Sequence, residues 1–321
     1  KASELEGAKN EVFYSRAKLL VAEGKNDNAI SFVRAFIDKN PADVQALALW
    51  FALAMEKGNA QDVIKHTQTQ FNTNKTNLNL RLLLARMYSL NSQLDKTVSL
   101  LSDVEGNEAS PQAFWNLKGQ ALIATNNVED ATAFFDRWLS FYPQDKNAVL
   151  GKLLIVDSQK QFDQGLTLTN KVLAKRPDAQ LTLWKAYFHS RLGQAKPAWE
   201  IINSTADDVK ALPFVRGVIA RLHLIDKAPE QAVEHAQAAY DATPNSDNAL
   251  LLIAALEMSG KKAQAFTFLE KHVQAHSNDI PSAMLLAERQ IGKDRAAAIK
   301  TYEQVLTKTP DNFVVLNNLA Y

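Results

Sequence analysis

The strongest constraint on this chain is a regular spacing of about 34 residues between corresponding prolines. The prolines that define it are Pro41, Pro143, Pro177, Pro244 and Pro310. Pro143 and Pro177 are 34 residues apart, while the last two steps, which pass through Ser277, are 33 residues each. A period of this length, continued along the chain, is typical of stacked structural repeats in which each repeat packs on its neighbours.

The segments that end at these prolines share one design. Each begins with a small residue, carries bulky or apolar residues four and seven positions later, and closes with a turn that resembles Pro-Asp. Examples are AISFVRAFIDKNPAD (29–43), ATAFFDRWLSFYPQD (131–145), AVEHAQAAYDATPNS (232–246) and AIKTYEQVLTKTPDN (298–312). We interpret the small residue as the point where two helices cross closely, and the bulky residue, such as Phe135 or Tyr302, as the filler of the space toward the next repeat. The stretch 298–312 therefore marks a structural unit and not a chemical site.

Each repeat contains two helical patterns, which we call helix A and helix B. Residues 115–122 exemplify helix A, with apolar or small residues at helical spacing. A short polar break follows, and four glycines fall in it, where a helix C-terminus favours a residue that tolerates positive φ. These glycines are Gly24, Gly58, Gly193 and Gly260. Four prolines fall in first turns, where proline is tolerated: Pro197 and Pro229 in helix B, Pro213 and Pro281 in helix A.

Because no single helix pair can bury both of its faces, the pattern predicts an all-α fold, an α-solenoid of stacked antiparallel helix pairs. The best single copy of the motif has Trp115, Gly119, Ala131, Phe135 and Pro143. In these residues and in the period the chain resembles the tetratricopeptide repeat (TPR) superfamily, and this resemblance implies that the solenoid is right-handed. Repeats aligned on this pattern start near residues 10, 44, 78, 112, 146, 180, 213, 246 and 279, with a truncated tenth from 313. We expect one array over residues 1–321, with irregular junctions near 106–111 and 203–213 and with Val63 and Thr97 in place of the small helix-B residue.

The composition excludes several kinds of function. The chain has 36 Lys+Arg against 35 Asp+Glu, and this balance argues against nucleic acid as a partner, which needs a concentrated basic surface. It has no cysteine, so thiolate catalysis and Cys-based zinc sites are excluded. No apolar run approaches the ~20 residues that span a bilayer.

We expect no cofactor and no metal. His272 and His276 have the spacing of two metal ligands on one helix face, but we assign them a structural role. Trp50, Trp138 and Trp184 are interpreted as packing residues.

The resemblance implies where a partner would bind. In TPR proteins a concave groove is lined by helix A, especially at repeat positions 2, 5, 9 and 12. Carried over to this chain, those positions give Glu11, Tyr14, Lys18, Arg86, Asn116, Gln120, Phe188, Arg221 and Asn317. The family's clamp for acidic C-terminal tails uses Lys and Asn, then Asn, then Lys and Arg, and that series is not found here. The mixed polar and apolar groove is therefore expected to take a peptide or a partner protein.

These observations lead to a functional hypothesis, a non-enzymatic scaffold for protein–protein interaction. The segment FVVLNNLAY (313–321) and the Asn/Lys-rich loops resemble bacterial envelope TPR lipoproteins linked to polysaccharide export and exosortase-associated sorting. That resemblance implies a periplasmic or outer-membrane-anchored protein with polysaccharide-export machinery as a partner; a cytoplasmic location is the alternative. We expect the natural chain to continue beyond Tyr321 and to have lost a lipid-anchored, Cys-initiated N-terminus before Lys1.

Two other functions remain open. The array could be the recruiting or regulatory region of a longer enzyme, such as a transferase. It could also bind polysaccharide directly, through exposed groove aromatics such as Tyr14 and Phe188.

Overall fold

In the computed structural model, which describes residues 2–320 and the side chains of residues 11–320, the chain is built from α-helices. No strand occurs in the described range. The helices are α1 (Ala2–Ala22), α2 (Asn26–Ile37), α3 (Val44–Glu56), α4 (Gln61–Thr73), α5 (Leu78–Leu90), α6 (Leu94–Leu101), α7 (Gln112–Ala124), α8 (Val128–Phe141), α9 (Lys146–Ser158), α10 (Phe162–Leu173), α11 (Ala179–Arg191), α12 (Ala195–Asn203), α13 (Asp207–Lys210), α14 (Pro213–Ile225), α15 (Pro229–Ala242), α16 (Ser246–Met258), α17 (Lys262–Ala275), α18 (Ile280–Ile291), α19 (Arg295–Leu306) and α20 (Phe313–Ala320). This confirms the predicted all-α repeat of helix pairs.

The A helices begin where the repeat pattern predicts, to within one residue, from the second repeat onward. Their first residues are Val44, Leu78, Gln112, Lys146, Ala179, Pro213, Ser246, Ile280 and Phe313. The first differs, because α1 already begins at Ala2 and not near residue 10. The sixth begins at 179 and not at 180. This difference changes the repeat position of Phe188, a predicted site residue, as described below.

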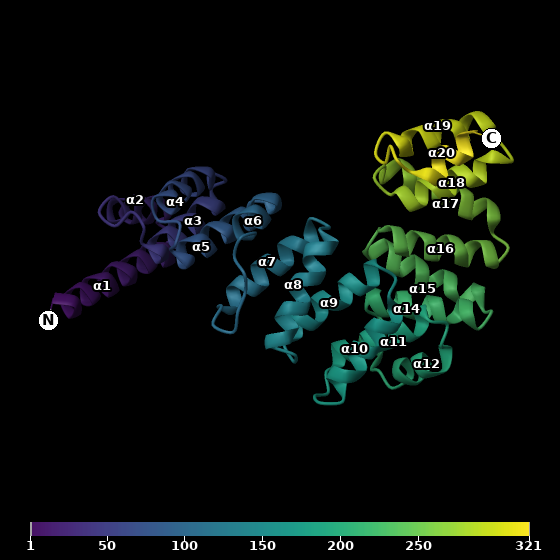
Figure 1. Ribbon diagram of the computed structural model, residues 1–321, viewed down its shortest axis with the longest axis horizontal. Coiled ribbons are helices and arrows are strands. Elements are labelled where there is room, and N and C mark those ends of the chain that lie inside the picture. The colour runs from purple at the N-terminus through teal and green to yellow at the C-terminus, as the bar shows by residue number, and fades with distance from the viewer. Residues whose placement is uncertain (1, 321) are drawn as a thin grey trace. The chain divides into compact units, whose positions relative to one another are not determined.

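The chain divides into two compact units, Lys1–Ser158 and Gln159–Tyr321. Unit 1 contains α1–α9 and unit 2 contains α10–α20, and within each unit consecutive helices pack side by side, as Figure 1 shows. A single continuous array thus stays a prediction, and each unit is described by itself. No helix between residues 2 and 320 is both long and apolar enough to cross a membrane.

The small residues of helix B lie where helices approach most closely. Ala29, Ala131 and Ala232 are fully buried, as the sequence predicts. Gly165 occupies this position in α10, and a Cβ there would lie 2.4 Å from the ring of Phe188 in α11. In unit 1 the ring of Phe135 fills the space toward the next repeat, because a Cβ on Gly151 would lie 2.1 Å from it.

The Pro-Asp-like turns prove to be helix caps. The Asp or Asn side chain that follows the turn accepts a hydrogen bond from a backbone N–H of the next A helix, which would otherwise be unsatisfied. Asp43, Asn77, Asp178, Asn245 and Asp279 act in this way. The motif therefore has two roles: it reverses the chain direction, and it caps the next A helix.

The A–B turns adopt a left-handed conformation at one position. Gly24, Gly58, Gly193 and Gly260 have φ between 70° and 78°, which confirms their predicted role. In other repeats the same place is taken by non-glycine residues with φ of 53° to 58°, namely Ser92, Asn126, Lys160 and Lys227. The turn geometry is thus common to most repeats although its sequence is not.

The junction after α6 is irregular, as predicted, and side chains from α7 and α8 hold it in place. Lys118 Nζ donates to the carbonyls of Leu101 (2.8 Å) and Val104 (3.0 Å) and so caps the C-terminus of the short α6. Burial lowers the pKa of this ammonium group, against the opposing effect of nearby carboxylates. Arg137 Nε donates to the Gly106 carbonyl at 2.5 Å. The junction near 203–213 contains the one-turn helix α13.

Candidate partner-binding surface

The predicted groove residues of unit 1 differ in how accessible they are. Glu11, Lys18, Arg86 and Gln120 are exposed. Tyr14 is half-buried, and its hydroxyl donates to Asp43 Oδ1 at 2.6 Å, so it joins α1 to the N-cap of α3. Burial raises the pKa of this phenol, and the hydrogen bond to Asp43 raises it further. Tyr14 therefore acts as a structural link between the first two repeats.

Asn116 belongs to a polar network on the A helices of unit 1. Its Oδ1 accepts from Asn147 Nδ2 at 3.1 Å and from Gln112 Nε2 at 3.4 Å. Gln112 Nε2 also donates to Asp145 Oδ2 at 3.1 Å. The network joins α7 to α9, and these uncharged amides can exchange their hydrogen bonds for those of a peptide backbone.

Phe188 corrects the sequence prediction. Its side chain has 0% exposure and packs against Gly165, so it belongs to the core and not to a partner-binding surface. The cause is a shift of one residue, which rotates a helical position by about 100°. Pro177 indicates a start at residue 180, whereas Ala198, which holds the small helix-B position, indicates 179, where α11 begins. With the start at 179, the ninth position of the repeat is Tyr187, and the spacing of the alanines was the signal that could have found it.

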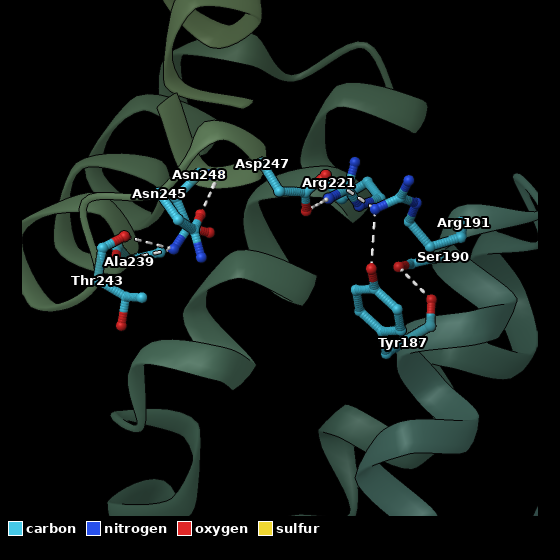
Figure 2. Close-up of polar contacts among 9 residues, drawn as sticks. All are labelled: Tyr187, Ser190, Arg191, Arg221, Ala239, Thr243, Asn245, Asp247 and Asn248. Carbon is cyan, nitrogen blue, oxygen red and sulfur yellow. Dashed lines mark hydrogen bonds and ion pairs between the residues drawn. The ribbon is translucent and has the colours of Figure 1, made fainter. Parts of the chain in front are cut away.

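Arg221 belongs to a cluster in unit 2 in which Asp247 joins it to Arg191 (Figure 2). Its Nη2 is 3.1 Å from Asp247 Oδ2, and Arg191 Nη1 is 2.9 Å from Asp247 Oδ1. Arg191 Nη1 also donates to the Tyr187 hydroxyl at 2.8 Å. Three successive A helices, α11, α14 and α16, supply these four residues. We call Tyr187, Arg191, Arg221 and Asp247 the arginine cluster.

Local structure fixes the members of the arginine cluster in position. Asp247 is the second residue of α16, and Asn245 caps that helix by accepting from Asn248 N at 3.0 Å. Asn248 Nδ2 in turn donates to the Thr243 carbonyl at 2.9 Å, which orders the turn between α15 and α16 (Figure 2). Arg191 also lies over the ring of Phe162, 4.3 Å from its centroid, a cation–π contact.

Aromatic rings border the arginine cluster. The ring centroid of Phe214, whose side chain is 39% exposed, lies 5.4 Å from that of Tyr187 and 5.2 Å from that of Trp184. Trp184 and Tyr187 also contact each other edge to face. An exposed ring beside guanidinium groups and a half-exposed carboxylate suits a peptide with both apolar and polar side chains.

Sequence reasoning predicted Arg221 but missed its partners. Asp247 occupies position 2 of its repeat, one of the expected groove positions, so the pattern could have identified it. Arg191 is position 12 when the sixth repeat is counted from residue 180, as it was for Phe188, so the pattern could have identified it too; counted from the observed start at 179 it is position 13. Asn317 is exposed on α20 in the last repeat and lies apart in sequence from the other predicted residues of unit 2.

His272, the first member of the histidine pair 272/276, belongs to a buried network. Tyr240 Oη lies 2.8 Å from His272 Nδ1, and His272 Nε2 lies 2.7 Å from Asp279 Oδ2. Ser282 Oγ donates to the same carboxylate oxygen at 2.8 Å. Burial opposes ionisation of Asp279, but its hydrogen bonds with His272 and Ser282 outweigh that effect and hold the pKa of the carboxyl below its usual range. Both ring nitrogens of His272 thus have protein partners.

Metal binding gains no support from the geometry. Among the side chains of residues 11–320, no group of three or more His, Asp or Glu residues is placed to hold a metal ion. Trp50 and Trp138 are buried in unit 1, in agreement with their interpretation as packing residues.

Comparison with known proteins supports the fold that the geometry defines. A family model described as tetratricopeptide repeat matches residues 98–146. No curated protein matches the chain in sequence. The family match and the shared helical architecture support the resemblance to the TPR superfamily.

Solved structures share this fold. The crystal structure of a tetratricopeptide repeat protein from Parabacteroides merdae is 17% identical, with a TM-score of 0.53, and the alignment covers 77% of this chain and 98% of that one. The APC/C hetero-tetramer Cut9–Hcn1 is 16% identical, with a TM-score of 0.55 and coverages of 92% and 58%. The human IFIT1 dimer with m7Gppp-AAAA is 11% identical, with a TM-score of 0.60 and coverages of 94% and 78%. At such identities the likeness shows the fold alone.

Proposed function

We propose that this chain is a non-enzymatic interaction scaffold that binds a peptide or a partner protein on the A-helix surface of unit 2. The observation that carries the proposal is the arginine cluster, in which three successive A helices bring two guanidinium groups, a half-exposed carboxylate and a phenol together beside Phe214. Arginine and aromatic residues dominate the binding energy of protein interfaces. The buried Tyr240–His272–Asp279–Ser282 network supports a structural role for His272. Its serine is not placed as a nucleophile activated by an imidazole, since Ser282 bonds to Asp279.

Crosslinking from the cluster tests this proposal. A photo-reactive amino acid would replace Phe214 in one protein and Gln237, an exposed residue of α15, in another. We expect Phe214 to crosslink one defined partner that Gln237 does not, with the partner then purified and its affinity measured by calorimetry.

Substitution then assigns the binding to the cluster. The variant Arg221→Ala should weaken that affinity at least about tenfold, in line with a hot-spot arginine, while Gln237→Ala should leave it unchanged. Equal affinities for the two variants would refute the cluster as the binding site.

The proposal also includes the cellular location and the partner of the protein. We infer a role in a bacterial envelope assembly, with polysaccharide-export machinery as the partner and a lipid-anchored periplasmic location. The support is the resemblance of residues 313–321 and of the Asn/Lys-rich loops to envelope TPR lipoproteins. Fractionation of cells that express the full-length gene, with a globomycin-sensitivity assay for lipoprotein processing, tests the location; recovery in the cytosol would contradict it.

Polysaccharide binding is the second candidate function, and the observation that favours it is the partly exposed ring of Phe214 beside Tyr187. Phe188, on which the sequence-based version of this idea depended, is buried and cannot contact a glycan. Titration with export polysaccharides, compared between the native protein and Phe214→Ala, separates this function from peptide binding. A third function, recruitment of substrates to the catalytic domain of a longer enzyme, is tested by a search of the complete reading frame for such a domain.

A further inference from the structure

Unit 2 has a second charged feature, a cavity of about 360 Å³ between α16, α17 and α18. Lys262, Arg289, Lys293 and Glu257 supply its charged lining, and Phe266 contributes an aromatic surface. Its volume lies at the lower end of the range of ligand sites, which is roughly 300–1,000 Å³. None of its lining residues belongs to the arginine cluster, so the following inference does not depend on the proposed function.

The charges of the cavity do not balance internally. Arg289 is paired with Glu257 in a two-pronged contact, Nε to Oε1 at 3.0 Å and Nη2 to Oε2 at 3.1 Å. This pair neutralises itself and leaves the ammonium groups of Lys262 and Lys293 as the excess charge. Lys293 Nζ lies 4.1 Å from the centroid of the Phe266 ring, a cation–π contact that positions one of the two charges at the cavity.

The corresponding junction in unit 1, between α2 and α3, has no such excess of positive charge. There Lys57 pairs with Asp27, and Asn26 Nδ2 donates to Glu56 Oε2 at 3.0 Å. Asp27 lies two residues before the small residue Ala29 of helix B, and the residue in the same place before Ala265 is Ala263. The acid that neutralises a lysine in unit 1 is therefore replaced by a neutral residue in unit 2, and the cavity lies at that junction.

We propose that this cavity binds a phosphate monoester dianion. Two ammonium groups match the charge of one dianion, and lysine binds phosphate as a compact point charge. The Glu257–Arg289 pair closes one side, and its guanidinium edge can donate to a phosphate oxygen. The apolar surface of Phe266 and Leu269 accommodates the carbon part of the ester. The group can belong to a small metabolite or to a phosphorylated side chain, and both present the same chemistry.

Calorimetric and NMR titrations with inorganic phosphate and with glycerol phosphate test the cavity. We expect saturable binding that moves the backbone amide signals of residues 262–266 and 289–293. The double variant Lys262→Met/Lys293→Met should weaken binding about tenfold or more per lysine, and Lys271→Met, an exposed lysine of the same helix outside the cavity, should not. Chloride at equal ionic strength controls for screening.

A further titration distinguishes the two sources of the ester. Tighter binding of a phosphoserine peptide than of glycerol phosphate assigns the site to a phosphorylated partner, and equal or weaker binding assigns it to a small molecule. Equal affinity of the native protein and the double variant for phosphate, or no saturation at millimolar concentration, would overturn the proposal. Because the two lysines are exposed, the double variant should keep the native melting temperature.

Discussion

Two core clusters, one in each unit, are built from different side chains. One cluster in unit 1 contains the aromatic residues Phe114, Trp115, Phe134, Phe135 and Trp138. One cluster in unit 2, formed by residues between 220 and 286, has no buried aromatic residue and contains Ala220, Ala232, Ala236, Ala255 and Ala265 beside Leu and Ile. Accordingly, the backbones of α14 and α15 stay close along more of their length than those of α7 and α8 do.

The difference shows two ways to stabilise the same repeat. Large rings fill wide spaces in the unit 1 cluster, and glycines such as Gly151 provide room for them; in unit 2 the same arrangement occurs where Gly165 meets Phe188, outside the alanine-rich cluster. Alanines bury less apolar area each, and unit 2 adds a hydrogen-bonded joint, Tyr240–His272–Asp279–Ser282, that connects α15, α17 and α18. We therefore expect unit 1 to be sensitive to lost volume, and unit 2 to added volume and to lost hydrogen bonds.

The largest effect is expected from Phe135→Ala in unit 1. Deletion of a buried ring costs about 3–5 kcal/mol of unfolding free energy, because the cavity collapses only in part. Denaturant titration measures the loss, and hydrogen exchange should show reduced protection first in α7–α9, since repeats couple to their neighbours. Leu154→Ala, at a 42% exposed site in α9, is the matched control and should cost much less. A loss below 1 kcal/mol for Phe135→Ala would remove the basis of the comparison.

Asp279→Asn tests the polar joint of unit 2. Asparagine can still cap α18, so the expected loss of roughly 1.5–3 kcal/mol reports the charge-assisted hydrogen bonds with His272 and Ser282. Asp294→Asn, at an exposed N-cap, is the control and should change stability by less than about 0.5 kcal/mol. If the two variants lose the same unfolding free energy, Asp279 stabilises unit 2 only as the N-cap of α18.

Ala236→Leu tests the sensitivity of unit 2 to added volume. Ala236 is fully buried in α15, and overpacking of a closely packed helix pair typically costs 1–3 kcal/mol. The neighbouring Gln237→Leu, on the exposed face, should be almost neutral. If thermal and chemical denaturation show no difference between the two variants, the close helix approach in unit 2 does not depend on small side chains.

A smaller, pH-dependent effect is expected from the stacked imidazoles of His223 and His235 in unit 2. Burial lowers the pKa of both, and Arg216 and His223 lower that of His235 further, while Asp226 and Glu234 act in the opposite direction. The unfolded chain binds protons near pH 6.5, so it holds more protons than the folded chain as the pH falls through that value. Unfolding free energy should therefore decrease between pH 7 and the lowered pKa values. The variant His223→Gln/His235→Gln should show a weaker decrease; an identical pH profile would contradict this assignment.

The smallest effect, and one that should be the same in both units, is expected at the left-handed turns. Ser92→Gly in unit 1 and Lys227→Gly in unit 2 relieve a positive φ of 57° and should each raise stability by about 0.5 kcal/mol. Gly58→Ala should lower it by a similar or larger amount. If one of the first two variants raises the unfolding free energy and the other lowers it, the two turns differ in structure as well as in sequence.

The sequence predicted the fold in detail because its signals are local. Proline spacing, the small residue of helix B and the glycines at helix C-termini identify the A–B pairs, and the A helices after the first begin within one residue of the expected positions. The candidate site was predicted less well. Arg221 was predicted, and Phe188 was named in place of its neighbour Tyr187. Arg191 was missed, although counting the sixth repeat from 180 places it at position 12, an expected groove position.

By itself the sequence determined the repeat length, the helix pairs, the caps and the all-α architecture, since hydrophobic period and capping residues act over a few neighbouring positions. Only the tertiary structure decided that Phe188 of α11 packs in the core while the hydroxyl of the largely buried Tyr187 meets Arg191, because a shift of one residue turns a side chain by about 100°. It also decided that Arg191 meets Asp247, 56 residues away, and that Lys262 and Lys293 border one cavity. Such contacts depend on how successive helices pack and on how far long side chains reach, and neither is encoded in a local pattern.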